Sequence, residues 1–122
     1  MLIVENIAYV ANVGDSRAIL SKNKGKDIVP LSKDHRPDRN IEHERITKNG
    51  GHLYQTQSNQ KVADLNGNIK TETIVGPLRV FPGRLSVSRT FGDIEAKLQK
   101  YGGNIKVVIA EPEIEVFTID ET

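Results

Sequence analysis

Short runs of β-branched and aromatic residues, each closed by turn residues, restrict the first part of this chain to strands. Residues 7–13 and 16–21 are two such runs, and residues 28–31 return along the second after the turn at Asn23-Lys24-Gly25. Residues 2–4 form either the hairpin partner of the first run or its own first turn. These residue types suit a half-buried pleated surface, and short turns favour hairpins. The sequence therefore predicts an antiparallel β-meander near the N-terminus.

Two later stretches carry helix signals. Pro37-Asp38 places a carboxylate at a helix start and Asn49-Gly50-Gly51 supplies a glycine-rich stop, so residues 41–48 are expected to form one short helix. In residues 94–101 the apolar side chains fall at helical spacing, and Gly102-Gly103 ends the run. We expect a second helix there.

Three further strands are expected in the second half of the chain. In residues 85–88, leucine and valine alternate with serine, as they do in a strand. Residues 106–110 and 114–119 are two more runs, and Pro112 between them cannot donate to a ladder. The expected fold class is therefore α/β (α+β) with mainly antiparallel sheets.

Residues 52–77 interrupt this pattern. They are polar, with few apolar residues at any regular spacing, and are expected to form a long loop or flap. The whole chain has 37% hydrophobic residues, 5% aromatic residues and a mean hydropathy of -0.42. These are few apolar residues for the core of a freestanding domain, as in a fragment whose core is completed by something else. Another polypeptide that completes the fold is therefore one expected partner.

Composition and motifs exclude several classes of protein. The net charge is +1 and no basic run is interleaved with aromatic residues, so neither a nucleic-acid nor a membrane partner is expected. There is no cysteine, no apolar run long enough to cross a bilayer and no signal-peptide pattern, so a cytoplasmic or nuclear location is expected. Neither a Gly-x-Ser-x-Gly elbow nor a phosphate-cradling glycine loop occurs.

Two carboxylates follow glycines in turns. Asp15 follows Gly14 at the end of a predicted strand, and Asp93 follows Gly92 before the predicted second helix. A short carboxylate there can bind a hard cation such as Mg²⁺ or Mn²⁺. The alternatives stay open: Asp15 can bond nearby amides of its turn, and Asp93 can cap the helix that follows.

Four charged or titratable residues are expected to be structural or exposed. Arg17 and Arg89 lie in strand motifs where an unpaired charge would be costly, so we expect them to pair with carboxylates such as Asp34 or Asp93. His43 lacks a partner at ligand spacing and is expected at the surface, as is His52.

Three segments occur in a particular order: ANVGDSR at residues 11–17, LSKDHRP at residues 31–37 and RLSVSRTFGD at residues 84–93. In this order they closely resemble the central part of the metal-dependent serine/threonine phosphatases of the protein phosphatase 2C family. The resemblance runs over residues 1–122, which would form one partial domain. It implies a four-layer α-β-β-α sandwich with mainly antiparallel sheets, to which this chain contributes strands of each sheet, with helices packed outside.

The resemblance also implies an activity. Enzymes of this family hydrolyse phosphoserine and phosphothreonine in proteins, using two Mg²⁺ or Mn²⁺ ions that bridge a water. The family holds these ions with aspartates in two early and two late motifs, and none of the four motifs occurs in this sequence. The isolated chain is therefore expected to be inactive. The flap-like insertion at residues 52–77 is longer than the common form in the family.

Individual residues inherit expectations from the resemblance. Asp15 would border the metal centre, and Asp93 would lie near it. Arg79 matches a motif on the flap beside the active site, where a guanidinium can engage phosphate or substrate backbone; the alternative is a solvent-exposed loop arginine. His35 belongs to an architectural motif that ties a turn ahead of the first helix. For the whole protein, the alternative to an enzyme is a non-catalytic pseudophosphatase or scaffold module that binds a protein partner.

Overall fold

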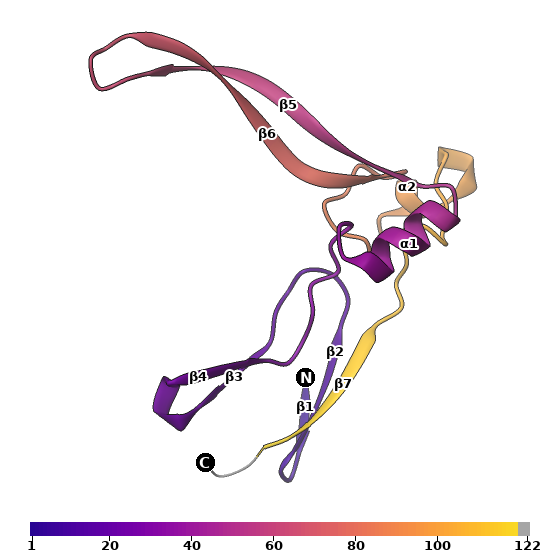
Figure 1. The fold of residues 1–122 in the computed structure, drawn as a ribbon. Coiled ribbons are helices and arrows are strands. Elements are labelled where there is room, and N and C mark those ends of the chain that lie inside the picture. Colours follow the sequence, from indigo (N-terminus) through magenta and orange to yellow (C-terminus); the bar gives the residue numbers. More distant parts are fainter. Residues whose placement is uncertain (120–122) are drawn as a thin grey trace.

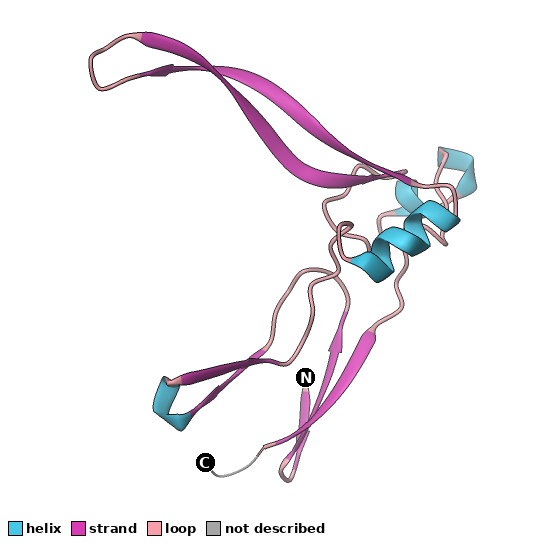
Figure 2. Ribbon diagram, in the orientation of Figure 1, coloured by secondary structure: helices cyan, strands magenta, loops and turns pink. Residues whose placement is uncertain are grey.

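The computed structural model describes residues 1–119 and is built mainly of antiparallel strands (Figures 1 and 2). In chain order the elements are β1 (Leu2–Val4), β2 (Ile7–Asn12), β3 (Ile19–Lys22), the 3₁₀ turn η1 (Asn23–Gly25), β4 (Asp27–Pro30), α1 (Asn40–Lys48), β5 (His52–Ala63), β6 (Ile69–Phe81), α2 (Ile94–Lys97), the 3₁₀ turn η2 (Gln99–Tyr101) and β7 (Glu113–Thr118). The predicted class, mixed α and β with antiparallel sheets, is confirmed. No helix among the described residues is long and apolar enough to span a membrane.

The strands expected near the N-terminus form, but as two separate hairpins and not as one meander, because β2 pairs with β1 and with β7 from the other end of the chain and does not pair with β3. The three-stranded sheet has the order β1-β2-β7, with both pairs antiparallel. Ala8 and Val10 of β2 are buried on one face, whereas Tyr9 between them is exposed on the other, where it pairs with Leu2 and Val116. Strands β3 and β4 form a separate hairpin. One face of the three-stranded sheet therefore stays open to solvent.

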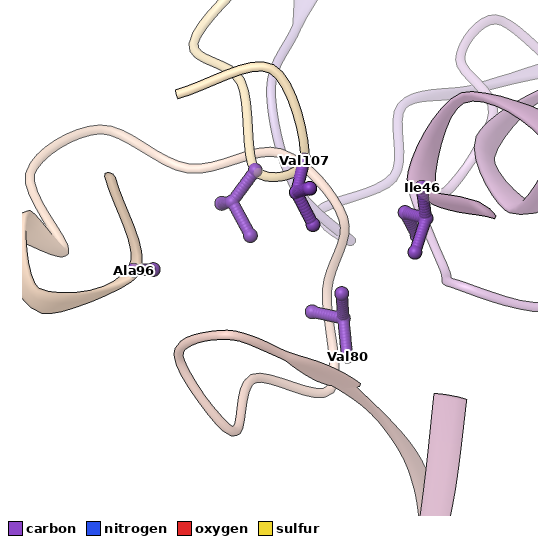
Figure 3. Packing of buried hydrophobic residues seen from close by; sticks show 5 residues of the cluster. Ile46, Val80, Ala96 and Val107 are labelled. Atoms are coloured by element: carbon purple, nitrogen blue, oxygen red, sulfur yellow. The ribbon is translucent and has the colours of Figure 1, made fainter. Parts of the chain in front are cut away.

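A small apolar core lies where four segments meet. Ile46 of α1, Val80 of β6, Ala96 of α2 and Val107 surround it (Figure 3). Gly51 is needed at this point, because a Cβ built on it would lie 2.7 Å from the Val107 side chain. Below about 3 Å such a contact forces the neighbours apart. The core therefore fixes the base of the β5–β6 hairpin against α1 and α2.

Residues 52–77 are not an irregular loop. Strands β5 and β6 pair antiparallel from His52 with Phe81 to Ala63 with Ile69, with one irregularity between Gln55 and Gln57. The hairpin projects away from the rest of the molecule (Figure 1). Neither face of its outer part is buried. The outer residues therefore lack the alternation of apolar and polar side chains by which a half-buried strand is recognised in a sequence. The sequence pattern therefore missed the strands.

Three other expectations for the second half were wrong or partly wrong. Residues 85–88 and 106–110 form no strand; they contribute only single bridges, between Val80 and Leu85 and between Arg89 and Ile109. The second helix is α2 alone, because the backbone of Leu98 is extended and the chain resumes as η2. In these connecting segments, contacts with distant residues override local alternation.

Candidate functional site

His35 is buried at the junction between the Gly14 turn, which follows β2, and the start of β7. Its ring is 0% exposed. The backbone N–H of Gly14 donates to Nδ1 at 3.1 Å, which makes Nε2 the protonated nitrogen that donates to Glu113 Oε2 at 3.1 Å. Burial, and then the charge of Arg89, lower the pKa of His35. A neutral imidazole therefore ties the Gly14 turn to β7, as expected of an architectural histidine.

Glu113 balances this junction electrostatically. Arg39 donates to it from two guanidinium nitrogens, at 2.5 and 3.0 Å. The hydrogen bonds from Arg39 lower the pKa of Glu113 to about 2, against a smaller opposing effect of burial. Lys33 lies 3.7 Å from the same carboxylate. Glu113 therefore stays ionised and holds the end of β7 next to the residues that precede α1.

Asp15 lies at the edge of this junction, on the turn that His35 fixes. Its side chain is exposed, and Arg36 Nη2 approaches it at 3.4 Å. Arg17 on the same turn forms a two-point contact with Asp34 at 3.0 and 2.8 Å, which confirms the expected pairing of Arg17. The hydrogen bonds from Arg17 lower the pKa of Asp34. The contact of Asp15 with Arg36 is therefore longer than either contact between Arg17 and Asp34.

A second carboxylate, Glu42 of α1, is fully buried and holds distant segments together. Arg89 donates to it from Nη2 at 2.6 Å and from Nε at 3.1 Å, and Ser88 Oγ donates at 2.5 Å. Arg45, one helical turn on, donates from Nη1 at 2.7 Å. Burial alone would raise the pKa of Glu42, but these hydrogen bonds outweigh it and lower the pKa to about 2. A buried charge is tolerated because every side of it is paired.

The two arginines extend this network to the backbone of the connecting segments. Arg89 Nη1 donates to the Glu111 carbonyl at 3.0 Å, and Arg45 Nη2 donates to the Ser88 carbonyl at 2.9 Å. The Ser88 N–H donates to the His35 carbonyl at 2.8 Å. The expectation that Arg89 pairs with a carboxylate is confirmed, but the partner is Glu42 and neither of the two suggested carboxylates, Asp93 and Asp34. Arg89 instead joins α1 to the segment beside the Gly14 turn.

Arg79 lies at the base of the β5–β6 hairpin, in β6 directly before the buried Val80. Its side chain is half-buried, and Nη1 donates to the carbonyl of Arg84 at 2.8 Å. The N–H of Val80 donates to the carbonyl of Leu85 at 2.8 Å, which closes the connecting turn of residues 81–84. Within residues 1–119, no carboxylate lies within ion-pair distance of Arg79. Arg79 is thus neither a simple solvent-exposed arginine nor a fully paired one.

Asp93 does not cap the helix that follows it. Its backbone is left-handed, with φ 47°, its side chain is exposed, and no side-chain hydrogen bond caps α2. The capping interpretation of Asp93 was therefore wrong. Within the described residues, no group of three or more histidine, aspartate or glutamate side chains is placed to hold a metal ion. Among residues 1–119, neither Asp15 nor Asp93 belongs to such a group.

The two histidines expected at the surface, His43 and His52, are exposed, and the ring of His52 lies 5.0 Å from that of Phe81. No prediction from the sequence included Glu42 or Glu113. For Glu42 a signal existed: it precedes Ile46 by four residues, so both lie on one helix face, and Ile46 is buried. A glutamate on the buried face of a helix needs a cationic partner. No comparable local signal marks Glu113.

The comparisons with known proteins cover the whole chain. The family model of protein phosphatase 2C matches residues 1–122. Probable protein phosphatase 2C 69 of Arabidopsis thaliana is 36% identical over 121 residues, which are 99% of this chain and 26% of that protein. Probable protein phosphatase 2C 4 of Paramecium tetraurelia is 31% identical over 119 residues, 97% of this chain and 31% of that protein. The chain thus spans between about a quarter and a third of these curated relatives.

Solved structures agree. A crystal structure of a phosphatase from a pathogenic strain of Toxoplasma gondii superposes with a TM-score of 0.59 at 29% identity, covering 93% of this chain and 28% of that chain. A sex determining protein of C. elegans superposes with a TM-score of 0.62 at 23% identity, covering 96% of this chain and 22% of that chain, and supports the fold alone. Since the family model extends over every residue of the sequence, this chain belongs to the protein phosphatase 2C family.

Proposed function

We propose that the full-length protein carrying this segment is a metal-dependent phosphatase that removes phosphate from phosphoserine and phosphothreonine in protein substrates. The observation that carries this proposal is the match of the protein phosphatase 2C family model to residues 1–122. Mg²⁺ or Mn²⁺ is the proposed cofactor. Because the described residues form no metal-ligand cluster, most of the ligands would come from parts of the protein outside this segment.

In this proposal the segment supplies a rigid frame and two side chains that face the substrate site. The frame is the pair of junctions around His35 and Glu42, two buried side chains that are each hydrogen-bonded to distant segments of the chain. Asp15 is carried on the turn that His35 fixes, so it would border the metal centre at a defined position. Preorganised groups bind developing charge without having to reorganise, which is the use of such a frame.

Arg79 is the residue of this segment that we propose contacts the phosphate or the substrate backbone. One N–H of its guanidinium already donates to the Arg84 carbonyl, and that bond restrains the group. The other donors of the fork remain for an oxygen ligand, and a planar guanidinium can bind two phosphate oxygens at once. Arg79 directly precedes Val80 of the buried cluster, so its backbone is anchored to the core.

The test uses the purified full-length protein and a phosphothreonine peptide, assayed with Mn²⁺, with Mg²⁺ and after chelation. We expect hydrolysis that depends on the metal. Arg79→Ala should lower kcat/KM by about 10-fold or more, mainly through KM, while Mn²⁺ affinity measured by calorimetry is unchanged. Lys106→Ala, which removes an exposed cation elsewhere, is the matched control. Unchanged kinetics in Arg79→Ala would reduce Arg79 to a structural residue, and a full-length protein without metal-dependent hydrolysis would support the scaffold alternative.

A further inference from the structure

We propose that the cavity between the turn of residues 81–84 and the α2–η2 segment binds an acidic stretch of the phosphoprotein substrate, and that Arg84 selects it. The cavity has a volume of about 320 Å³ and is lined by Phe81, Pro82, Gly83, Arg84, Glu95, Tyr101 and Gly102. This inference rests on the proposed function, because it names a preference within the same substrate class.

The turn that carries Arg84 is held in place on three sides. The hydrogen bond from the Val80 N–H to the Leu85 carbonyl closes it, and the bond from Arg79 to the Arg84 carbonyl supports its backbone. Gly83 lies so close to α2 that an added Cβ would come within 2.4 Å of the Ala96 Cβ. The turn is therefore fixed to the same core that Figure 3 shows around Val80 and Ala96. A side chain on this turn is presented from a rigid base.

Arg84 itself is unusual in two ways. Its backbone is left-handed, with φ 59°, a conformation that an arginine adopts at an energetic cost. Its side chain is exposed, and within residues 1–119 no carboxylate lies at ion-pair distance from it. The arginines of the other surfaces differ, because Arg17, Arg39 and Arg45 each pair with a carboxylate. Arg84 therefore keeps its guanidinium for a ligand.

The walls of the cavity explain why the ligand is an acidic segment of a protein. Phe81 and Tyr101 are partly exposed and offer apolar surface to a peptide backbone or a neighbouring side chain. Lys100 lies over the Tyr101 ring at 4.7 Å and adds a second cation at that wall. Among the lining residues Arg84 and Glu95 carry one charge of each sign, so Lys100 beside the Tyr101 wall leaves an excess of one positive charge. Arginine beside aromatic surface is a common way of binding acidic peptide segments.

The proposal assigns Arg84 a role that differs from that of Arg79. Arg79 touches the phosphate in the proposed reaction and affects all substrates alike, whereas Arg84 contacts residues that flank the phosphorylated side chain. Loss of Arg84 should therefore change the ranking of substrates. An interaction between charges that are partly shielded from water discriminates by about 5- to 10-fold between a peptide with an acidic flank and its neutral counterpart.

The experiment compares phosphothreonine peptides that differ only in their flanking residues, with glutamate, glutamine or lysine placed before or after the phosphorylated residue. For the full-length protein we expect kcat/KM to be about 5- to 10-fold higher for an acidic flank on one side than for glutamine. Arg84→Gly suits the left-handed backbone and should abolish this ratio, and Arg84→Glu should shift the preference toward lysine. Lys106→Glu, a charge reversal on another exposed residue, should leave the ratio unchanged.

Two results would overturn the proposal. One is an acidic preference that survives in Arg84→Glu; the other is equal use of all flanks by the unmodified protein. Hydrolysis of p-nitrophenyl phosphate, a substrate without flanking residues, tells separately whether the protein is a phosphatase at all. If it is not, affinity for the same peptides, measured by fluorescence anisotropy, still tests the cavity, because equal affinity of acidic and neutral peptides would contradict the role of Arg84.

Discussion

At the scale of single residues, buried charge decides how the segment holds together. Glu42 and Arg89 lie 47 residues apart in the sequence and meet at 2.6 Å in the interior. Arg45 and Ser88 complete the set, so each oxygen of the carboxylate has a donor. Removing one member of a buried ion pair leaves the other charge unpaired, which costs more than the pair itself contributes.

We therefore expect Glu42→Gln to destabilise the full-length protein by about 3–5 kcal/mol, measured as the free energy of unfolding in urea. The amide cannot balance the charge of Arg89, which is also buried. Glu44→Gln, on the exposed face of the same helix, is the matched control and should change stability by less than about 0.5 kcal/mol. Equal effects of the two substitutions would contradict the assigned role of Glu42.

The low pKa values of Glu42 and Glu113, each about 2 against an ordinary value of 4.5, predict an acid-sensitive fold. A carboxyl whose pKa is lowered in the folded state contributes stability above its unfolded pKa and loses it as the pH falls through the folded pKa. Stability should therefore fall from pH 4.5 toward pH 2. Urea unfolding across this range checks it, and Glu42→Gln should show a shallower decline; a decline as steep as that of the unmodified protein would contradict the prediction.

His35 predicts a separate dependence at higher pH. Its pKa is lowered in the folded state, so below the ordinary value of 6.5 the unfolded chain takes up a proton that the folded chain does not. Stability should therefore begin to fall as the pH drops below 6.5. His35→Gln should remove this upper part of the decline while leaving the carboxylate part in place. If the free energy of unfolding falls equally from pH 7 to pH 5 in His35→Gln and in the unmodified protein, the prediction is contradicted.

At the scale of elements, the β5–β6 hairpin is the part least coupled to the core. Only its base, through Leu53 and Val80, packs against the buried cluster. The outer strands are exposed on both faces, and their tip is organised locally by Asp64, whose carboxylate accepts from the N–H groups of Asn66 and Asn68 at 2.9 Å each. The outer part of the hairpin therefore gains little stability from the rest of the fold and contributes little stability to it.

Shortening this hairpin should therefore leave the remaining fold intact. Gln57 pairs with Val75, so residues 58–74 can be replaced by Asn-Gly, which favours a two-residue hairpin turn. We expect the free energy of unfolding of the full-length protein to change by less than about 1 kcal/mol. Ile46→Ala in the core should by contrast cost about 2–5 kcal/mol. A loss of similar size on shortening would show that the hairpin packs against another part of the protein.

At the scale of the whole molecule, the segment leaves apolar surface open. Leu2, Tyr9, Ile114 and Val116 share the exposed face of the β1-β2-β7 sheet, and the buried apolar cluster elsewhere consists of five small or medium side chains. The segment spans between about a quarter and a third of its curated relatives. A sheet that is apolar on a solvent-exposed face gains stability when another layer covers it.

We expect the 122-residue chain on its own to be inactive and only weakly stable. Thermal unfolding followed by circular dichroism should show a broad transition, and a dye that binds exposed apolar surface should fluoresce more with the isolated chain than with the full-length protein. A cooperative transition above about 45 °C would show that the small core and the two polar junctions suffice for a stable fold.

What the sequence by itself determined was local. Runs of β-branched residues closed by turns specify β1 to β4, glycines after residue 48 end α1, and the order of three short motifs identifies the family. Each of these features lies within a few neighbouring residues. At that range, secondary-structure propensity and the burial of one face show in the sequence as residue type and as a regular spacing of apolar residues. The pairing of Arg17 with Asp34 could also be anticipated, because an arginine in a strand motif needs a carboxylate.

The tertiary structure alone decided the rest. The β5–β6 hairpin has no buried outer face, so it has no apolar period to read. Glu42 and Arg89 find each other across 47 residues, and Arg89 therefore does not pair with the nearby Asp93. Arg84 becomes a candidate ligand residue only because a turn fixed by Arg79 and Ala96 presents it over a cavity. Contacts between residues far apart in the chain leave no periodic trace in one sequence, and such contacts define both junctions and the cavity.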